Sequence, residues 1–61
     1  MTQMQAIDIA EGLVEAKDDK EYLAAWQCLI DTGLAWSLQG RFGRAAAQLI
    51  QDGHCTPPAN E

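Results

Sequence analysis

The clearest pattern of apolar and polar positions in this chain lies in its centre. From position 22, apolar residues recur at i, i+1, i+4, i+7 and i+8, which predicts an amphipathic helix over residues 19–31. Asp18, followed three residues later by Glu21, is typical of an N-cap with its reciprocal acid. Gly33 suits the left-handed position that ends a helix. The stripe consists of Tyr22, Leu23, Trp26, Leu29 and Ile30.

Weaker helical spacing continues on both sides of this segment. We expect a first helix over residues 4–16, in which Gly12 costs up to about 1 kcal/mol relative to Ala. A short helical turn over 34–39 and a last helix over 42–52, closed by Gly53, complete the chain. The expected apolar faces are Met4, Ile7, Ala10 and Val14 with Ile9 and Leu13 beside them, and Phe42, Ala45, Ala46, Leu49 and Ile50.

No segment shows the alternation of a strand. The sequence therefore predicts an all-α fold: one small bundle of three main helices plus one short connecting helical turn, over residues 1–53. Residues 54–61 are expected to form a flexible C-terminal tail. For 61 residues, burial contributes on the order of 85–90 kcal/mol against about 90 kcal/mol for ordering the chain. Because this balance is near zero, a homodimer is expected.

Composition excludes several classes of protein. Hydrophobic residues make up 48% of the chain, too many for an intrinsically disordered protein, and no apolar run approaches the ~20 residues of a membrane span. The first basic residue is Lys17, so no secretory signal is expected. With only Cys28 and Cys55, the chain is expected in a cytosol with both thiols reduced.

The charges are unevenly distributed along the chain. Residues 1–31 carry seven acids and two bases, a net charge of −5, whereas residues 32–61 are neutral overall. Because nucleic-acid affinity depends on neutralising phosphates, direct nucleic-acid binding is not favoured. A basic protein partner, or a protein site that normally holds nucleic acid, fits the acidic half better.

The residues that could carry chemistry do not form a recognisable site. His54, Cys55 and Cys28 are too few and wrongly spaced for structural zinc, and a thiol on a tail lacks a scaffold to orient a base. No catalytic, metal-binding or cofactor-binding residue is predicted, so the chain is not expected to be an enzyme. The acids at the first helix joint are interleaved with Lys17 and Lys20 and indicate a solvated or docking face: Glu11, Glu15, Asp18, Asp19 and Glu21.

A second glycine-containing segment permits a nucleic-acid alternative. Residues 40–43 match the G-x-x-G loop of one RNA-binding module, and residues 43–52 could follow as the recognition helix of a helix-turn-helix. The RNA-binding module needs a β-sheet beside its loop, which this sequence does not predict, and the helix-turn-helix would have too little positive charge to hold DNA. A small nucleic-acid-binding helical module therefore stays the less favoured alternative to a tight helix–helix corner.

Four residues near this corner are candidates for binding a protein partner: Trp36, Gln39, Arg41 and Arg44. Trp and Arg are the types most enriched in binding hot spots. Trp26 and Phe42 lie on apolar stripes and are expected in the core, whereas the spacing leaves open whether Trp36 is core or surface.

The corner itself is expected to be held by Asp31, Gly33, Gly40 and Gly43. Asp31 lies in the last turn of one helix and Arg44 in the first turn of another, each unfavourable against the helix dipole. We therefore predict an Asp31–Arg44 or Asp31–Arg41 pair across the corner.

Residues 31–44 read DTGLAWSLQGRFGR. This box, within residues 29–53, resembles a family of very short, uncharacterised proteins of tailed bacteriophages, which carry D-T-G-L-A-W-x-L-Q-G-x-[FY]-G-R. The resemblance implies a host bacterial cytoplasm. By analogy with small phage proteins, it implies a non-enzymatic accessory protein that binds and modulates or inhibits a host protein, for example as an anti-defence or anti-CRISPR-like inhibitor. The alternative is a phage-internal accessory of replication, transcription or the virion.

Overall fold

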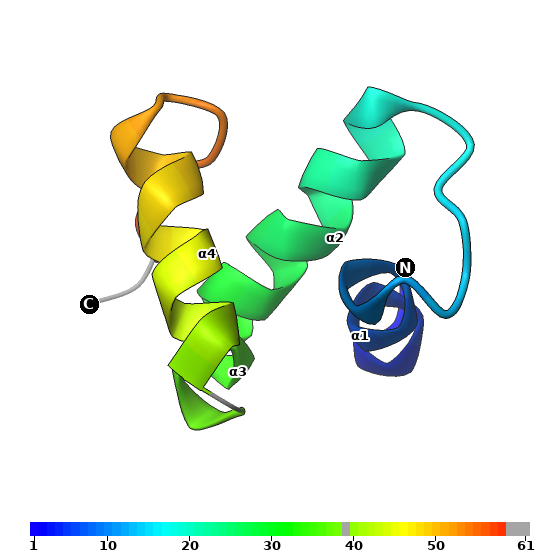
Figure 1. Cartoon of the computed structure of the whole chain (residues 1–61), viewed down its shortest axis with the longest axis horizontal. Helices are drawn as coiled ribbons and strands as arrows, with labels where there is room; N and C mark the ends of the chain where they lie inside the picture. The colour runs from blue at the N-terminus through cyan, green and yellow to red at the C-terminus, as the bar shows by residue number, and fades with distance from the viewer. Residues whose placement is uncertain (39, 59–61) are drawn as a thin grey trace.

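Four helices make up the computed structural model, which describes residues 1–38 and 40–58 (Figure 1). The helices are α1 (Gln3–Glu11), α2 (Asp19–Thr32), α3 (Leu34–Ser37) and α4 (Gly40–Gln51). The described residues contain no strand. The predicted all-α fold, with three main helices and one short connecting turn, is confirmed.

Helix α2 is the centre of the arrangement. It packs against α1 on one side, and α3 then turns the chain so that α4 rises on the other side (Figure 1). Helices α2 and α4 run in opposite directions and separate toward the end where α2 begins. None of the described helices has the length and apolar content needed to cross a membrane.

Side-chain caps fix the starts of α1 and α2. The backbone N–H of Glu21 donates to Asp18 Oδ1 at 2.8 Å, as the sequence predicts. The reciprocal bond is shifted by one residue, because Glu21 Oε1 accepts from the N–H of Lys17 at 2.8 Å. Thr2 caps α1 in the same manner: its Oγ1 accepts from the N–H of Gln5 at 3.1 Å, and its own N–H donates to Gln5 Oε1 at 3.0 Å.

Two glycines end these helices in the left-handed conformation. Gly33 has φ = 82° and ends α2, as predicted. Gly12, with φ = 85°, ends α1 at Glu11, so the predicted continuation to residue 16 is wrong. A glycine that the helical spacing placed inside α1 is in fact its C-cap.

The core is small and centred on α2. Trp26 stacks obliquely on Phe42, with ring centroids 5.8 Å apart and an angle of 40° between the planes, so both are core residues as predicted. The stripe of α2 is buried except at its start, where Tyr22 is 42% exposed. The buried residues are Ala6, Ile9, Ala25, Trp26, Leu29, Ile30, Ala35, Phe42, Ala46 and Cys55.

Helix α1 packs on the core through only part of the expected face, because Ile7, Ile9 and Ala10 contact the core as predicted but Met4 does not. Ala6 and Ile9 are buried against α2, whereas Met4 is 69% exposed and Val14 49% exposed. Because α1 ends at Glu11, Val14 lies outside the helix and cannot contribute to its apolar face. The small side chain of Ala6 then allows α1 to approach α2 closely.

The segment after α4 differs from the expected tail at its first residues. The side chain of Cys55 is only 5% exposed and belongs to the core. The carboxamide of Gln27 forms two bonds with Thr56, donating to its carbonyl oxygen at 3.0 Å and accepting from its N–H at 2.9 Å. Residues 54–56 therefore fold back onto α2.

Candidate protein-interaction surfaces

Trp36 lies at the corner between α3 and α4, on top of a glycine. A Cβ added to Gly43 would lie 3.4 Å from Trp36 Cδ1 and 3.6 Å from the carbonyl oxygen of Ala35. The indole therefore lies close to α4, at a distance where a Cβ at position 43 would make an ordinary van der Waals contact with it. With 49% of its surface exposed, Trp36 is held on one side and open to solvent on the other. Trp36, which the spacing left open as a core or a surface residue, is therefore a half-exposed surface residue.

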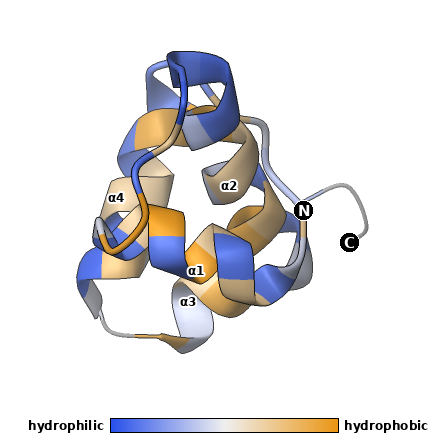
Figure 2. Ribbon diagram, turned by 90° about the vertical axis from the view of Figure 1, so that its right-hand side faces the viewer, coloured by the Kyte–Doolittle hydropathy of each residue, from blue (hydrophilic) through white to orange (hydrophobic). Residues whose placement is uncertain are grey.

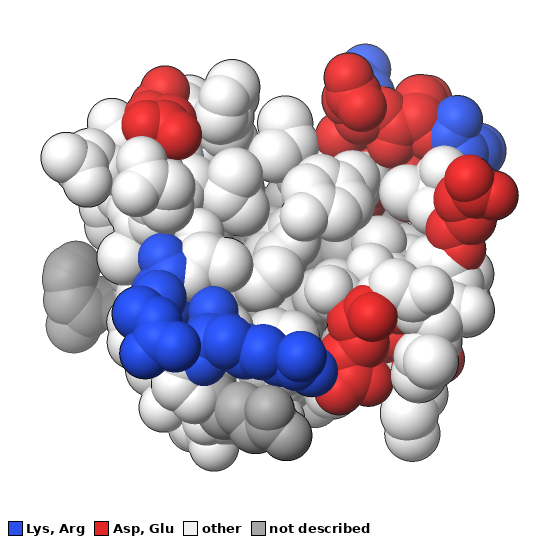
Figure 3. All heavy atoms as spheres, in the orientation of Figure 1, with Lys and Arg blue, Asp and Glu red and all other residues white. Residues whose placement is uncertain are grey.

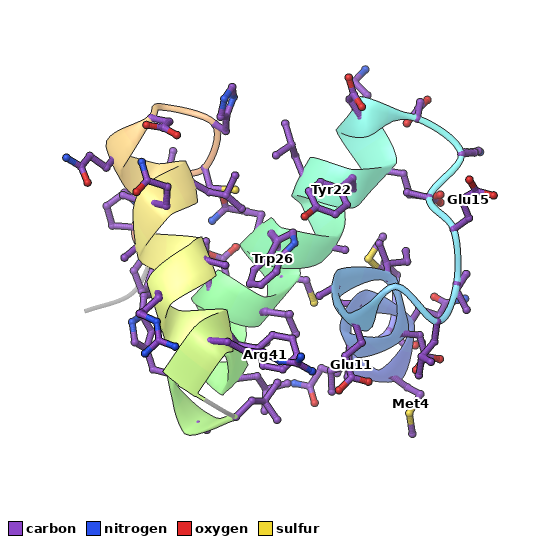
Figure 4. All side chains as sticks on the ribbon, in the orientation of Figure 1. Met4, Glu11, Glu15, Tyr22, Trp26 and Arg41 are labelled. Atoms are coloured by element: carbon purple, nitrogen blue, oxygen red, sulfur yellow. The ribbon has the colours of Figure 1, made fainter. Side chains whose placement is uncertain are left out.

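The two arginines of the predicted site point to different places. Arg44 lies along the start of α4, where its Nη1 would be 3.6 Å from a Cβ at Gly40. Arg41 places its guanidinium carbon 5.2 Å from the ring centroid of Phe42, within cation–π range. In Figure 4, the Arg41 side chain extends from α4 toward Glu11 at the end of α1. Gln39 lies outside the described residues.

The predicted ion pair at the corner does not form. Within residues 1–38 and 40–58, neither arginine has a carboxylate oxygen within 4.0 Å. The carboxylate of Asp31 instead accepts from Nε2 of Gln27, one turn earlier on α2, at 3.0 Å. The hydroxyl of Thr32 also donates back to the carbonyl oxygen of Cys28 at 2.8 Å. At the C-terminal end of α2, the polar side chains therefore bond within α2 and not to the arginines of α4.

Two hollows lie along the boundary between α2 and α4, and we call them together the α2–α4 groove. Each has a volume of about 250–260 Å³. Figure 3 shows an uncharged surface between the arginines at one end of this face and the acids around α2 at the other. The lower hollow is lined by Ala10, Glu11, Trp26, Arg41, Phe42 and Ala45, and the upper hollow by Asp19, Tyr22, Leu23, Leu49 and His54.

Trp26 brings an unpartnered donor to this groove. Its indole is 4% exposed, and its Nε1 has no hydrogen-bond acceptor within the described chain. Buried polar atoms of this kind are few in native proteins and call for a reason. Trp26 and Tyr22 lie one turn apart on the side of α2 that faces α4 (Figure 4). Sequence reasoning placed Trp26 in the core but gave no signal for its unpaired N–H.

A third surface is formed by α1 and the turn after it. Met1, Met4, Leu13 and Val14 are 49–73% exposed. Figure 2 shows α1 on the side of the molecule that faces the viewer. A hollow of about 410 Å³ next to it is lined by residues that include Asp8. Residues 1–16 contain three acids and no Lys or Arg, so this α1 surface combines apolar groups with negative charge.

The acids expected to form a solvated or docking face have several roles. Asp18 and Glu21 cap α2, and Glu11 borders the groove. In Figure 4 the side chain of Glu15 lies on the turn after α1, on the side remote from α4. No group of three or more His, Cys, Asp or Glu side chains is positioned to bind a metal ion in the described part of the chain.

Cys55 is a core side chain. Its Sγ lies 3.9 Å from the carbonyl oxygen of Leu23, and burial, followed by the negative charge of Asp31, raises the pKa of the thiol. Cys28 is half-buried, and both cysteines are free thiols. The neighbouring His54 is exposed.

The fold and these surfaces define a small, all-helical protein with large apolar side chains exposed at three places. The chain belongs to the family described as "Domain of unknown function (DUF7417)", whose model matches residues 1–60. No curated protein and no solved structure matches the chain.

Proposed function

We propose that this protein is a non-enzymatic, phage-encoded accessory protein that binds and modulates or inhibits a host protein in the bacterial cytoplasm. The observation that carries the proposal is the half-exposed indole of Trp36, fixed on Gly43 at the start of α4. A large aromatic side chain in such a position is typical of a binding hot spot.

Two properties of the corner favour binding over a purely structural role. The contact with Gly43 restricts the indole before any partner arrives, which lowers the entropy lost on binding. Arg44 lies exposed on the same first turn of α4 and can donate to a carboxylate of a partner. The chemistry of the corner therefore fits a protein surface that offers an apolar pocket beside an acid.

The phage context rests on the resemblance of residues 31–44 to the phage box. In the fold, this box covers the end of α2, α3 and the start of α4, which are the elements that build the corner. The residues that match this box include both Trp36 and Gly43. An anti-defence inhibitor of the anti-CRISPR type is one form of this function, and this protein is expected to act without a cofactor.

The proposal is tested by capture from infected host lysate, read by mass spectrometry. Wild-type bait is compared with Trp36→Ala and with Met4→Ala, a control that removes an even more exposed apolar side chain from α1. We expect a host protein that is retained by wild type and Met4→Ala and lost with Trp36→Ala. Circular dichroism of each bait shows that the fold is intact.

Two other results decide against the proposal. Capture of phage proteins alone supports the alternative, an internal accessory of phage replication, transcription or the virion. A host protein retained equally by Trp36→Ala shows that the corner is not the binding site.

A further inference from the structure

The two ends of the α2–α4 groove carry opposite net charge. At the lower end, Glu11 and Arg41 line the groove, and Arg44 follows Arg41 about one turn later on α4, for a net charge of +1. Figure 3 shows basic side chains gathered at this end. At the upper end, residues 17–21 carry three acids and two lysines, and Asp52 at the end of α4 adds another acid, for a net charge of −2. The surface between the two ends is uncharged.

We infer that the α2–α4 groove is the interface of a homodimer, in which a second copy of this chain packs face to face in the opposite direction. A two-fold axis lying in the plane of this face and crossing the groove brings the arginine end of each copy onto the acidic end of the other. Such an isologous contact is self-complementary, and both charge pairs form at once.

Aromatic residues along the groove support the same occupant. Trp26 borders the lower hollow, while its unpartnered Nε1 is itself buried inside the chain. Tyr22, exposed along the same side of α2, adds the aromatic area that protein interfaces favour.

A dimer has to use most of this face. A standard interface buries about 800 Å² on each partner, which is about a fifth of the 4134 Å² that this chain exposes. The face in Figure 1 measures 28 × 21 Å, an outline smaller than this area, so the side chains of the whole face take part. By contrast, the α1 surface is a poor dimer interface, because two copies would bring three acids against three with no Lys or Arg to offset them.

The test is a charge exchange between Arg41 and Asp19, which lie at opposite ends of the groove. Sedimentation equilibrium from about 1 to about 200 μM gives the dimer dissociation constant. We expect Arg41→Glu and Asp19→Lys each to raise the dissociation constant at least about tenfold, because each replaces two attractive contacts with two repulsive ones. An equimolar mixture of the two variants restores dimers to within about threefold of wild type, since both contacts between unlike chains become attractive again.

Two controls separate this geometry from other modes of association. Glu15→Lys makes the same charge change as Asp19→Lys but on the turn after α1, and Met4→Ala trims the α1 surface. Both are expected to leave the dissociation constant unchanged. Circular dichroism of each variant at the lowest concentration checks that the monomer is folded.

A wild-type chain that stays monomeric over this range overturns the inference, as does a mixture that fails to restore dimers. The inference is also overturned if the two control variants raise the dissociation constant as much as the groove variants do, because the interface would then lie on α1. The inference shares Arg44 with the proposed function but does not involve Trp36. The capture experiment with Trp36→Ala and the exchange between Arg41 and Asp19 can therefore fail separately.

Discussion

Replacing glycine with alanine is expected to lower stability at Gly33 but not at Gly43. Gly33 has φ = 82°, and no atom lies within 4 Å of the position that a Cβ would take. The cost of Gly33→Ala therefore comes from the left-handed backbone itself, at about 1–2 kcal/mol. Alanine also makes the unfolded chain less flexible, which stabilises the folded state by about 0.4–1 kcal/mol. We therefore expect Gly33→Ala to lower the free energy of unfolding by about 1 kcal/mol.

Gly43 lies inside α4 with ordinary helical geometry. Its added Cβ would meet Trp36 Cδ1 at 3.4 Å, which is a van der Waals contact and not a clash. Removing a glycine from a helix interior stabilises the helix by up to about 1 kcal/mol. We therefore expect Gly43→Ala to be neutral or stabilising, with the indole kept in place.

Urea and thermal unfolding followed by circular dichroism measure both changes. For a domain of this size, 1 kcal/mol corresponds to about 4–8 °C in Tm. Ala47→Gly, at an exposed position of the same helix, is the matched control and is expected to lose about 1 kcal/mol. If Gly43→Ala lowers the Tm as much as Gly33→Ala does, the indole needs the glycine, and the contact geometry that we infer for the corner is refuted.

Three further changes test the caps, the corner and the thiols. Asp18→Ala is expected to cost about 1 kcal/mol in urea unfolding, whereas Asp18→Asn, which can still accept the cap hydrogen bond, costs a few tenths. A double-mutant cycle of Asp31→Asn with Arg44→Gln is expected to give a coupling below about 0.3 kcal/mol, because the two side chains do not pair; a larger coupling contradicts the structure. In timed alkylation read by intact mass, Cys55 is expected to react more slowly than Cys28, because burial, and then Asp31, raises the pKa of the Cys55 thiol. Because the thiol ionises at a lower pH in the unfolded chain than in the folded one, the free energy of unfolding is expected to fall as the pH rises above the unfolded pKa of the thiol. Equal alkylation rates of the two cysteines, or the same pH dependence in Cys55→Ala, would contradict the raised pKa of Cys55.

Helix α2 could be predicted nearly to the residue because its signals are local. An N-cap acid, an apolar stripe of helical spacing and a terminal glycine agree with one another between Asp18 and Gly33. The all-α class follows from the same spacing elsewhere in the chain.

The errors arose where a local signal had two meanings or where none existed. Gly12 fits either the interior of a helix or its end, and the choice depends on how α1 packs on α2. The burial of Cys55 depends on the contact between Gln27 and Thr56, which are 29 residues apart, so no periodicity in the tail can reveal it. The pair predicted for Asp31 failed because a nearer donor on its own helix was available in Gln27.

The two tryptophans show how the residue beneath a ring decides its role. Trp26 faces Phe42, a ring large enough to cover the indole, and so it becomes core at the expense of an unpaired N–H. Trp36 faces Gly43, which supports one side of the indole and leaves the rest uncovered. In a chain of 61 residues there is too little mass to bury both rings and pair both indole nitrogens. The apolar area that stays uncovered is therefore divided between the corner at Trp36 and the groove beside Tyr22.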